Sequence, residues 1–158
     1  MDYVIRSCDS GDLDALVVLC GKHAAYEKSQ YSNNGKVERL IEGLFAMNPP
    51  LHCLVVESSK NLIGYCSYTF DFSTWDAGYF LHLDCLFIEE DFRGMSIGEK
   101  LIRQIISIAR QRKCVNVQWQ TPAFNEDAIR FYKRMGATAQ EKQRFTFDLR
   151  EDWVSETK

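Results

Sequence analysis

The sequence predicts one domain of the mixed α/β class. Its 158 residues are 46% hydrophobic and 13% aromatic, which is enough apolar surface for one core of ordinary size. Segments in which every second residue is apolar alternate with segments in which apolar residues recur at helical spacing. The expected order is a strand, two helices, three strands, a helix, a strand, a helix and a last strand. Helices and a sheet therefore share one core.

The first part of the chain is predicted to form a strand and two helices. Residues 3–8 alternate weakly between apolar and polar side chains, as a strand does. A helix is expected over 12–27, because the helix-start signal SGD precedes apolar residues at steps of three and four. After a loop at 29–35, the second helix ends before the proline pair at 49–50, since proline lacks the N–H group that continues a helix.

Three strands follow in the middle of the chain. Strands at 52–57 and 62–72 are joined by a polar turn at 59–61, and the next strand covers 79–88 after a loop at 73–78. The order of these segments predicts neighbouring strands that pair in sequence.

The last part of the chain alternates helices with strands. An amphipathic helix begins at Glu99, and its C-terminal end is basic, which complements the helix dipole. A strand is expected at 115–120 and a helix at 126–135, stopped by Gly136. Residues 145–149 are predicted to form the last strand.

Composition argues against several classes of protein. The net charge is −3, which is too acidic for a nucleic-acid-binding protein. No run approaches the roughly 18 apolar residues that span a bilayer, and the start lacks the pattern of a secretory signal. None of the six cysteines has CxxC spacing, so neither a metal site nor a disulfide framework is expected. Buried, reduced thiols in a cytoplasmic protein are the expectation.

Charge is unevenly distributed along the chain. Residues 1–92 carry 6 Lys and Arg against 14 Asp and Glu, a net charge of −8, whereas residues 93–158 carry 13 against 8, a net charge of +5. This uneven distribution indicates two ligands, a cationic one bound by the first half and an anionic one bound by the second. The alternative is that the charges cluster by accident on solvated faces.

The loop between Phe92 and Glu99 is suited to an anion. Glycines at 94 and 98 permit close backbone approach, and the first turn of a helix presents free N–H groups. Arg93 adds a cation suited to phosphate. An ordinary strand–helix turn is the alternative. The loop matches neither the P-loop nor GxGxxG, so NTPase and dinucleotide-binding functions are not indicated.

Two motifs resemble one family. The sequence RGMSIG at 93–98 resembles the R-G-x-G-I-G signature of the GNAT superfamily of N-acetyltransferases, whose loop holds the pyrophosphate of acetyl-CoA. The family usually has glycine at Ser96; if this position needs a positive φ, serine costs about 1 kcal/mol. The sequence NEDAIRFYKRMGA at 125–137 resembles the family's N-x-x-A-x-x-F-Y-x-x-x-G helix.

Further stretches resemble the spermidine/spermine (diamine) N-acetyltransferase branch. They include YVIR at 3–6, AAYEK at 24–28, HCLVVE at 52–57 and YTFDFSTWDAGYFLHLD at 68–84. The resemblance implies the GNAT fold, a single domain over 1–158 with a mixed, mostly antiparallel sheet flanked by helices. It also implies acetyl-CoA as co-substrate and a homodimer. The expected substrate is a polyamine, a diamine or a lysine- or ornithine-like amino acid. Aminoglycoside acetylation and a non-catalytic acetyl-CoA sensor are the alternatives.

The same resemblance implies the residues of the cofactor site. Asn125 contacts the CoA arm, and Tyr132 lies near the sulfur and acts as general acid toward the thiolate. Backbone N–H groups of Phe87 or Ile88 polarise the acetyl carbonyl and bind the pantetheine. The expected cofactor residues are Phe87, Ile88, Arg93, Gly94, Met95, Ser96, Ile97, Gly98, Asn125 and Tyr132.

Asp84 is the candidate for binding or deprotonating the amine. It is the one charged residue of the apolar run 79–88, and the diamine acetyltransferases usually place a glutamate there. A primary ammonium with a pKa near ~10.4 must lose a proton before it attacks. His82 shares the Asp84 face by strand alternation, whereas Cys85 is expected on the opposite face, which disfavours an acetyl-cysteine route.

Acidic and aromatic residues together are suited to bind the ammonium group. Those expected to contact the substrate are Tyr26, Glu27, Asp71, Trp75, Asp76, His82 and Asp84. For each acid taken singly, a solvated surface position is the alternative. Specificity is expected in loops 29–36 and 73–78.

Overall fold

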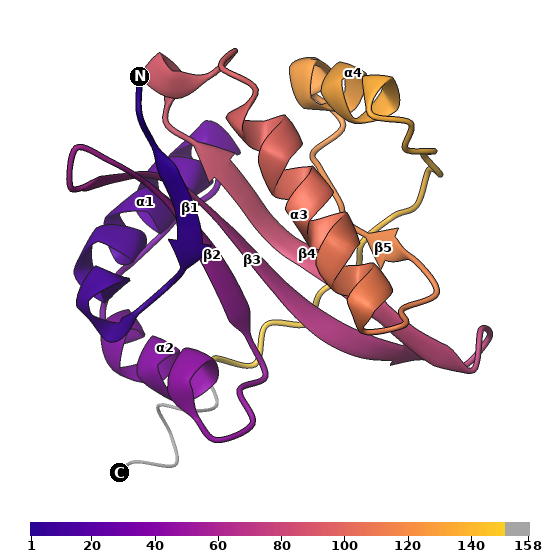
Figure 1. The fold of residues 1–158 in the computed structure, drawn as a ribbon. Helices are drawn as coiled ribbons and strands as arrows, with labels where there is room; N and C mark the ends of the chain where they lie inside the picture. Colours follow the sequence, from indigo (N-terminus) through magenta and orange to yellow (C-terminus); the bar gives the residue numbers. More distant parts are fainter. Residues whose placement is uncertain (151–158) are drawn as a thin grey trace, which may run out of the picture. The chain divides into compact units, whose positions relative to one another are not determined.

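The computed structural model describes residues 1–150, which fall into two compact units. The first unit, Met1–Asn125, contains the whole sheet and three of the helices, and the second unit begins at Glu126. Figure 1 shows the elements of each unit in chain colours. The residues predicted to bind the amine all lie in the first unit.

Five strands form one sheet whose spatial order is the chain order, β1-β2-β3-β4-β5. Neighbours from β1 to β4 are antiparallel, and β5 runs parallel to β4. This confirms the mixed, mostly antiparallel sheet that the sequence predicts. The strands are β1 (Val4–Ser7), β2 (His52–Ser58), β3 (Asn61–Ser73), β4 (Gly78–Ile88) and β5 (Val117–Gln118).

Helices cover both faces of the sheet (Figure 1). On one face α1 (Leu13–Tyr26) and α2 (Lys36–Phe45) bury leucines against Val55, Tyr65 and Phe87 of the strands. On the other face α3 (Ile97–Gln111) packs against β4. The buried residues of α3 recur at steps of one, three and four, which places them on one side of the helix: Ile97, Leu101, Ile102, Ile105 and Ala109.

A charged cluster joins β1, β2 and the start of α1. Arg6 donates to both carboxylate oxygens of Asp12, at 2.7 and 2.9 Å, and its Nε donates to Glu57 at 2.9 Å. Asp12 also accepts the backbone N–H of Asp9, at 2.8 Å, within the capping box of the short 3-10 helix Ser10–Asp12. The cluster fixes the direction in which α1 leaves the first strand.

The predicted turn between β2 and β3 is confirmed. Ser59 and Lys60 both have positive φ, 50° and 66°, so the connection is a two-residue turn of the kind that matches the twist of a hairpin. The strand expected at 115–120 is shorter than predicted, since β5 has only two residues.

The second unit contains α4 (Glu126–Arg134), which ends one residue earlier than predicted and is followed by the predicted stop, Gly136. Gly136 has a φ of 95°, and the N–H of Ala137 donates to the carbonyl of Tyr132, at 3.1 Å. The left-handed residue closes the helix with a hydrogen bond to a carbonyl of its last turn.

The strand predicted at 145–149 is wrong. These residues have no regular structure, and the side chains of Phe145 and Phe147 are 88% and 95% exposed. Alternation of apolar residues stabilises a strand only where one face is buried and an edge is available for pairing. In the described part of the chain this segment pairs with no strand, and its apolar side chains are exposed.

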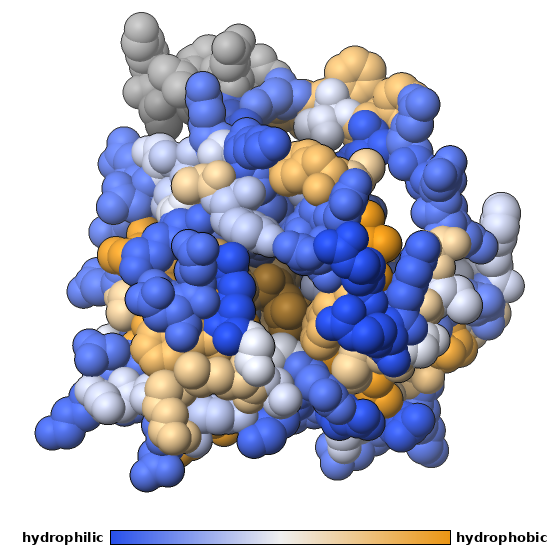
Figure 2. Space-filling model, turned by 90° about the horizontal axis from the view of Figure 1, so that it is seen from above, coloured by the Kyte–Doolittle hydropathy of each residue, from blue (hydrophilic) through white to orange (hydrophobic). Residues whose placement is uncertain are grey.

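The surface carries mostly hydrophilic residues with smaller hydrophobic areas among them, as Figure 2 shows for one face. Among the helices of residues 1–150, none is long and apolar enough to cross a bilayer. The same residues contain no group of three or more His, Cys, Asp or Glu side chains arranged to hold a metal ion.

Candidate active site

A bulge in β4 sets the position of Asp84. Ser67 of β3 lies opposite Cys85, and the next residue, Tyr68, lies opposite Leu83. Asp84 is therefore the extra residue and has no partner across the ladder. A bulge bends its strand and redirects the side chain there. The Asp84 side chain is exposed, and its Oδ2 accepts the Ser67 hydroxyl at 3.4 Å.

The predicted separation of Asp84 and Cys85 onto opposite faces is wrong. The Cys85 thiol donates to Asp84 Oδ2 at 3.7 Å, and Cys85 packs against the core cluster beneath α1. The bulge is the reason, because an inserted residue interrupts the two-residue alternation. Burial, with the Asp84 charge adding to it, raises the pKa of Cys85 to about 12. The thiol is therefore protonated at neutral pH and is a poor nucleophile.

The end of β4 lies beyond the reach of β5. In the described ladder, β5 pairs with β4 at Leu81 and His82 and at no later residue. The backbone from Leu83 to Ile88 thus has an edge without a strand partner. The Ile88 carbonyl accepts a hydrogen bond from Arg93 Nε at 2.9 Å, so the backbone groups of Ile88 face this open edge. Glu89, one residue on, donates to Ile63 of β3.

The direction of the backbone groups distinguishes Phe87 from Ile88, the two predicted backbone donors. In an antiparallel strand the N–H and C=O of one residue point to the same side, and successive residues point to opposite sides. The N–H of Ile88 therefore faces the open edge, and that of Phe87 faces β3. The geometry favours Ile88 as the donor to a ligand that lies along the edge.

The loop after β4 collects backbone N–H groups. Gly94 and Ser96 both have positive φ, 76° and 59°, and α3 starts at the next residue, Ile97. Within residues 1–150, the N–H groups of 94–99 donate to no acceptor. Consecutive amides in a left-handed turn, continued by a helix N-terminus, form a concave anion site. The side chain of Ile97 is 2% exposed, so it packs in the core and only its backbone belongs to this site.

Arg93 connects this loop to the first helix. Its guanidinium lies 4.4 Å from the ring centre of Tyr26 and 5.6 Å from that of Phe87. Tyr26 in turn donates its hydroxyl to Asn125 Oδ1, at 3.2 Å. The fold thus brings together a predicted substrate residue, Tyr26, and two predicted cofactor residues, Arg93 and Asn125.

Sequence reasoning missed His23. Its ring lies between α1 and the sheet, with Nδ1 2.9 Å from the Tyr65 hydroxyl and Nε2 3.2 Å from Glu27 Oε1. The ring also stacks on Phe87, with centres 5.3 Å apart. The one available signal was the spacing of four residues between His23 and Glu27, which places both on one helix face. The partner on β3 has no such signal.

Other predicted substrate residues lie elsewhere. Asp71 is paired with Phe80, and Trp75 and Asp76 lie in the exposed connection between β3 and β4. No contact in the described residues joins these three to the cluster around Phe87. Their role remains a prediction. His82, two residues before Asp84, is half-buried opposite Thr69.

Tyr132 lies on α4 in the second unit. Its ring contacts that of Phe131, with centres 5.2 Å apart. The role predicted for it as a proton donor also stays a prediction.

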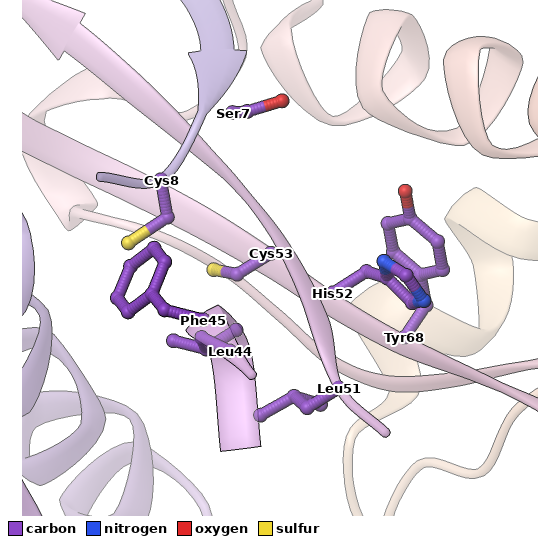
Figure 3. Close-up of a pocket in the computed structure, with 8 residues that line it drawn as sticks. All are labelled: Ser7, Cys8, Leu44, Phe45, Leu51, His52, Cys53 and Tyr68. Atoms are coloured by element: carbon purple, nitrogen blue, oxygen red, sulfur yellow. The ribbon is translucent and has the colours of Figure 1, made fainter. Parts of the chain in front are cut away.

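A separate pocket of about 120 Å³ lies between β1, β2 and α2 (Figure 3). The thiols of Cys8 and Cys53 and the ring of Phe45 line it on one side, and His52 stacks on Tyr68 with centres 5.2 Å apart. Burial, with the nearby Arg112 charge, lowers the pKa of His52 below its usual range. None of the residues predicted for catalysis or binding lines this pocket.

Comparison with known proteins agrees with the fold. The model of the acetyltransferase (GNAT) family matches residues 22–137, and the chain belongs to this family. It is therefore an enzyme of the N-acetyltransferase type, as predicted.

The relatives support the diamine branch of the family. The chain is 29% identical over 142 residues to a thialysine N-epsilon-acetyltransferase of Sus scrofa, covering 85% of this chain and 83% of the relative. It is 26% identical to the spermidine/spermine N(1)-acetyltransferase-like protein 1 of Homo sapiens, over 87% of this chain and 21% of that protein.

Solved structures show the same fold. An aminoglycoside N-acetyltransferase in complex with CoA superposes with a TM-score of 0.77 at 16% identity, over 94% of this chain and 95% of that one. At this identity the similarity concerns the fold alone.

Proposed function

We propose that the protein is an acetyl-CoA-dependent N-acetyltransferase that acetylates a primary amine of a small cationic substrate. The observation that carries the proposal is the open edge of β4, which runs from the Asp84 bulge toward the amide-lined loop before α3. One strand thus offers a carboxylate for the amine, backbone groups for an extended arm and, beyond its end, an anion site for a diphosphate. Polyamines, diamines and lysine-like amino acids carry ammonium groups that the predicted acids, Asp84 and Glu27, would attract.

The chain's own groups account for each requirement of the reaction. Acetyl-CoA, when bound, supplies the acetyl thioester. Asp84 attracts the ammonium and receives its proton, directly or through water, so that the nitrogen lone pair is free. The N–H of Ile88 polarises the acetyl carbonyl. Tyr132 donates a proton to the departing thiolate. The amide-rich loop at 94–99 and Asn125 hold the CoA portion.

The names of two relatives support the substrate class. The names of the two relatives refer to thialysine and to spermidine/spermine, both of which are amines. The sequence resemblance to the diamine branch further implies that residues 1–158 form a single domain and that the protein works as a cytoplasmic homodimer. Sedimentation at micromolar concentration tests the dimer.

The first experiment measures CoA release by the purified protein with separate amines: spermidine, putrescine, lysine, ornithine, thialysine and kanamycin. Turnover of one of the first five is expected. Turnover of kanamycin alone would replace the proposal with aminoglycoside acetylation. Tight acetyl-CoA binding without turnover of any amine would instead indicate a sensor.

The role of Asp84 is tested by Asp84→Asn, which keeps the size of the side chain. Loss of the charge is expected to reduce kcat/KM for the amine by about 100-fold or more, because general base catalysis typically contributes about 10²- to 10⁴-fold. The matched control is Asp14→Asn, an exposed position of α1. Unchanged activity and amine KM between about pH 6 and pH 9 would remove Asp84 from the mechanism.

A further inference from the structure

Three side chains from two elements form one hydrogen-bonded chain. Tyr65 lies in the middle of β3, and His23 and Glu27 lie four residues apart at the end of α1. The imidazole is between the other two, 2.9 Å from the phenol and 3.2 Å from the carboxylate. The chain therefore runs from the buried sheet to a partly exposed acid.

The protons in this chain have one consistent arrangement. Tyr65 is 3% exposed, and burial raises the pKa of its phenol well above the usual range, so it keeps its proton. Cys20 and Cys85 lie beside it, and burial raises the pKa of both thiols. A carboxylate only accepts hydrogen bonds, so Nε2 of His23 carries the proton that Glu27 accepts. In the tautomer that has this proton alone, Nδ1 is an acceptor and the Tyr65 hydroxyl donates to it.

Packing holds the imidazole in place. Its side chain is 12% exposed, it stacks on Phe87, and it meets the Tyr65 ring edge-on at 5.9 Å. A ring that stacks on Phe87 and is bonded at both nitrogens cannot turn without losing a hydrogen bond. Glu27, whose side chain is 33% exposed, is the most exposed of the three residues.

Both acids, Glu27 and Asp84, lie close to the buried Tyr65. Glu27 is joined to Tyr65 through His23, and Cys85, whose thiol donates to Asp84, packs against the core cluster that contains Tyr65. Tyr65 and Phe87 pair across β3 and β4. Each acid therefore contacts a side chain that packs against these two rings.

We propose that His23 is a positioning residue that orients the Glu27 carboxylate toward the second, non-reacting cationic group of the substrate, with Tyr65 fixing the imidazole tautomer. The inference rests on the proposed function, since it assigns Glu27 to the same amine site. A free glutamate samples several rotamers, and ordering it costs conformational entropy on binding. The His23 hydrogen bond removes that cost before the substrate arrives. Substrates with two cationic groups gain from this, and monoamines do not.

The kinetic test uses His23→Leu, which removes both hydrogen bonds. The KM for spermidine is expected to rise about tenfold, with kcat and the KM for acetyl-CoA unchanged within about twofold. His23→Gln keeps a side-chain N–H that reaches Glu27 and should restore most of the loss. Tyr65→Phe removes only the hydroxyl and should raise the same KM. A uniform fall in kcat in all three variants, with no change in KM, would overturn the proposal.

A double-mutant cycle separates positioning from a general structural effect. In a Glu27→Gln background, His23→Leu should raise the spermidine KM no further, because His23 acts through the Glu27 carboxylate. Additive effects would overturn the proposal. If Glu27→Gln itself leaves the KM unchanged while spermidine is acetylated, the inference fails and the proposed function stands.

A readout that does not depend on activity is the ¹⁵N spectrum of the His23 imidazole. A proton on Nε2 is expected in the wild type, and Tyr65→Phe should mix the two tautomers. A proton on Nδ1 in the wild type would overturn the inference. If no amine is acetylated, the proposed function fails while this tautomer is still measured.

Discussion

At the scale of single residues, Ser96 holds a conformation that glycine adopts at lower free energy. Its φ of 59° lies in the left-handed region, immediately before the first residue of α3. An L-residue with a Cβ atom is destabilised there by about 1–2 kcal/mol. The positive φ that the family motif implied is therefore present, although this chain has serine.

Ser96→Gly is expected to raise the free energy of unfolding by about 0.5–1 kcal/mol, the relief of strain less the backbone entropy of glycine. Chemical denaturation measures it. The matched control is Ser107→Gly, an exposed position within the same helix, which should lower stability by about 0.5 kcal/mol. If both changes have the same sign, the strain assigned to Ser96 is absent.

Asp84 shows what a residue pattern can and cannot indicate. The charge in an apolar run marked it as functional in the sequence. Its bulge depends on how β3 pairs with β4, and no local pattern in β4 encodes that register. For the same reason the contact between Asp84 and Cys85 could not be predicted.

At the scale of elements, the close approach of β3 and β4 depends on Gly64. It lies opposite Ile88, and a Cβ atom there would come within 2.8 Å of the Phe87 carbonyl oxygen and 2.6 Å of Ile88 Cδ1. A backbone atom cannot move aside cheaply. The residue without a side chain therefore sets the position of the strand that carries the candidate site.

Gly64→Ala is expected to lower the free energy of unfolding by about 1–3 kcal/mol, because β4 must shift. The shift should also raise the KM for acetyl-CoA, since it moves the open edge near Ile88. Gly43→Ala is the control: its Cβ would lie 4.0 Å from Leu51, within α2, where alanine favours the helix. Wild-type stability and KM in Gly64→Ala would contradict this account of β4.

The elements that the sequence predicted well are those with a strong period and a buried face. Helix α3 and strands β2 to β4 have both. The segment 145–149 has the period and no partner, so the pattern alone was misleading. The His23–Tyr65 contact joins residues 42 positions apart, and only the packing of α1 on the sheet reveals it.

At the scale of the whole molecule, the Arg6 cluster makes stability depend on acidity. Hydrogen bonds from Arg6 lower the pKa of Asp12, which is 8% exposed. A carboxyl group whose folded pKa is depressed stabilises the fold above its unfolded pKa, near ~3.9. That contribution is lost as the pH falls through the lower, folded pKa.

Asp12→Asn is expected to lower the free energy of unfolding by about 2 kcal/mol at pH 7. The difference from the wild type should shrink as the pH falls below about 4, where the wild-type carboxyl also becomes neutral. Thermal unfolding across this range measures both. Asp2→Asn, at an exposed position before β1, is the control without such a trend. A difference that does not change with pH would show that Asp12 acts through packing alone.

The open edge of β4 has a consequence for the lifetime of the protein. Under the proposed function, acetyl-CoA completes that edge in the folded chain and has no equivalent partner in the unfolded one. Mass action then adds about 2.7 kcal/mol of stability when the ligand is at a hundred times its dissociation constant. The amount of enzyme that survives turnover by proteases would follow the supply of acetyl groups, so the acetylation capacity of the cell would fall together with its donor.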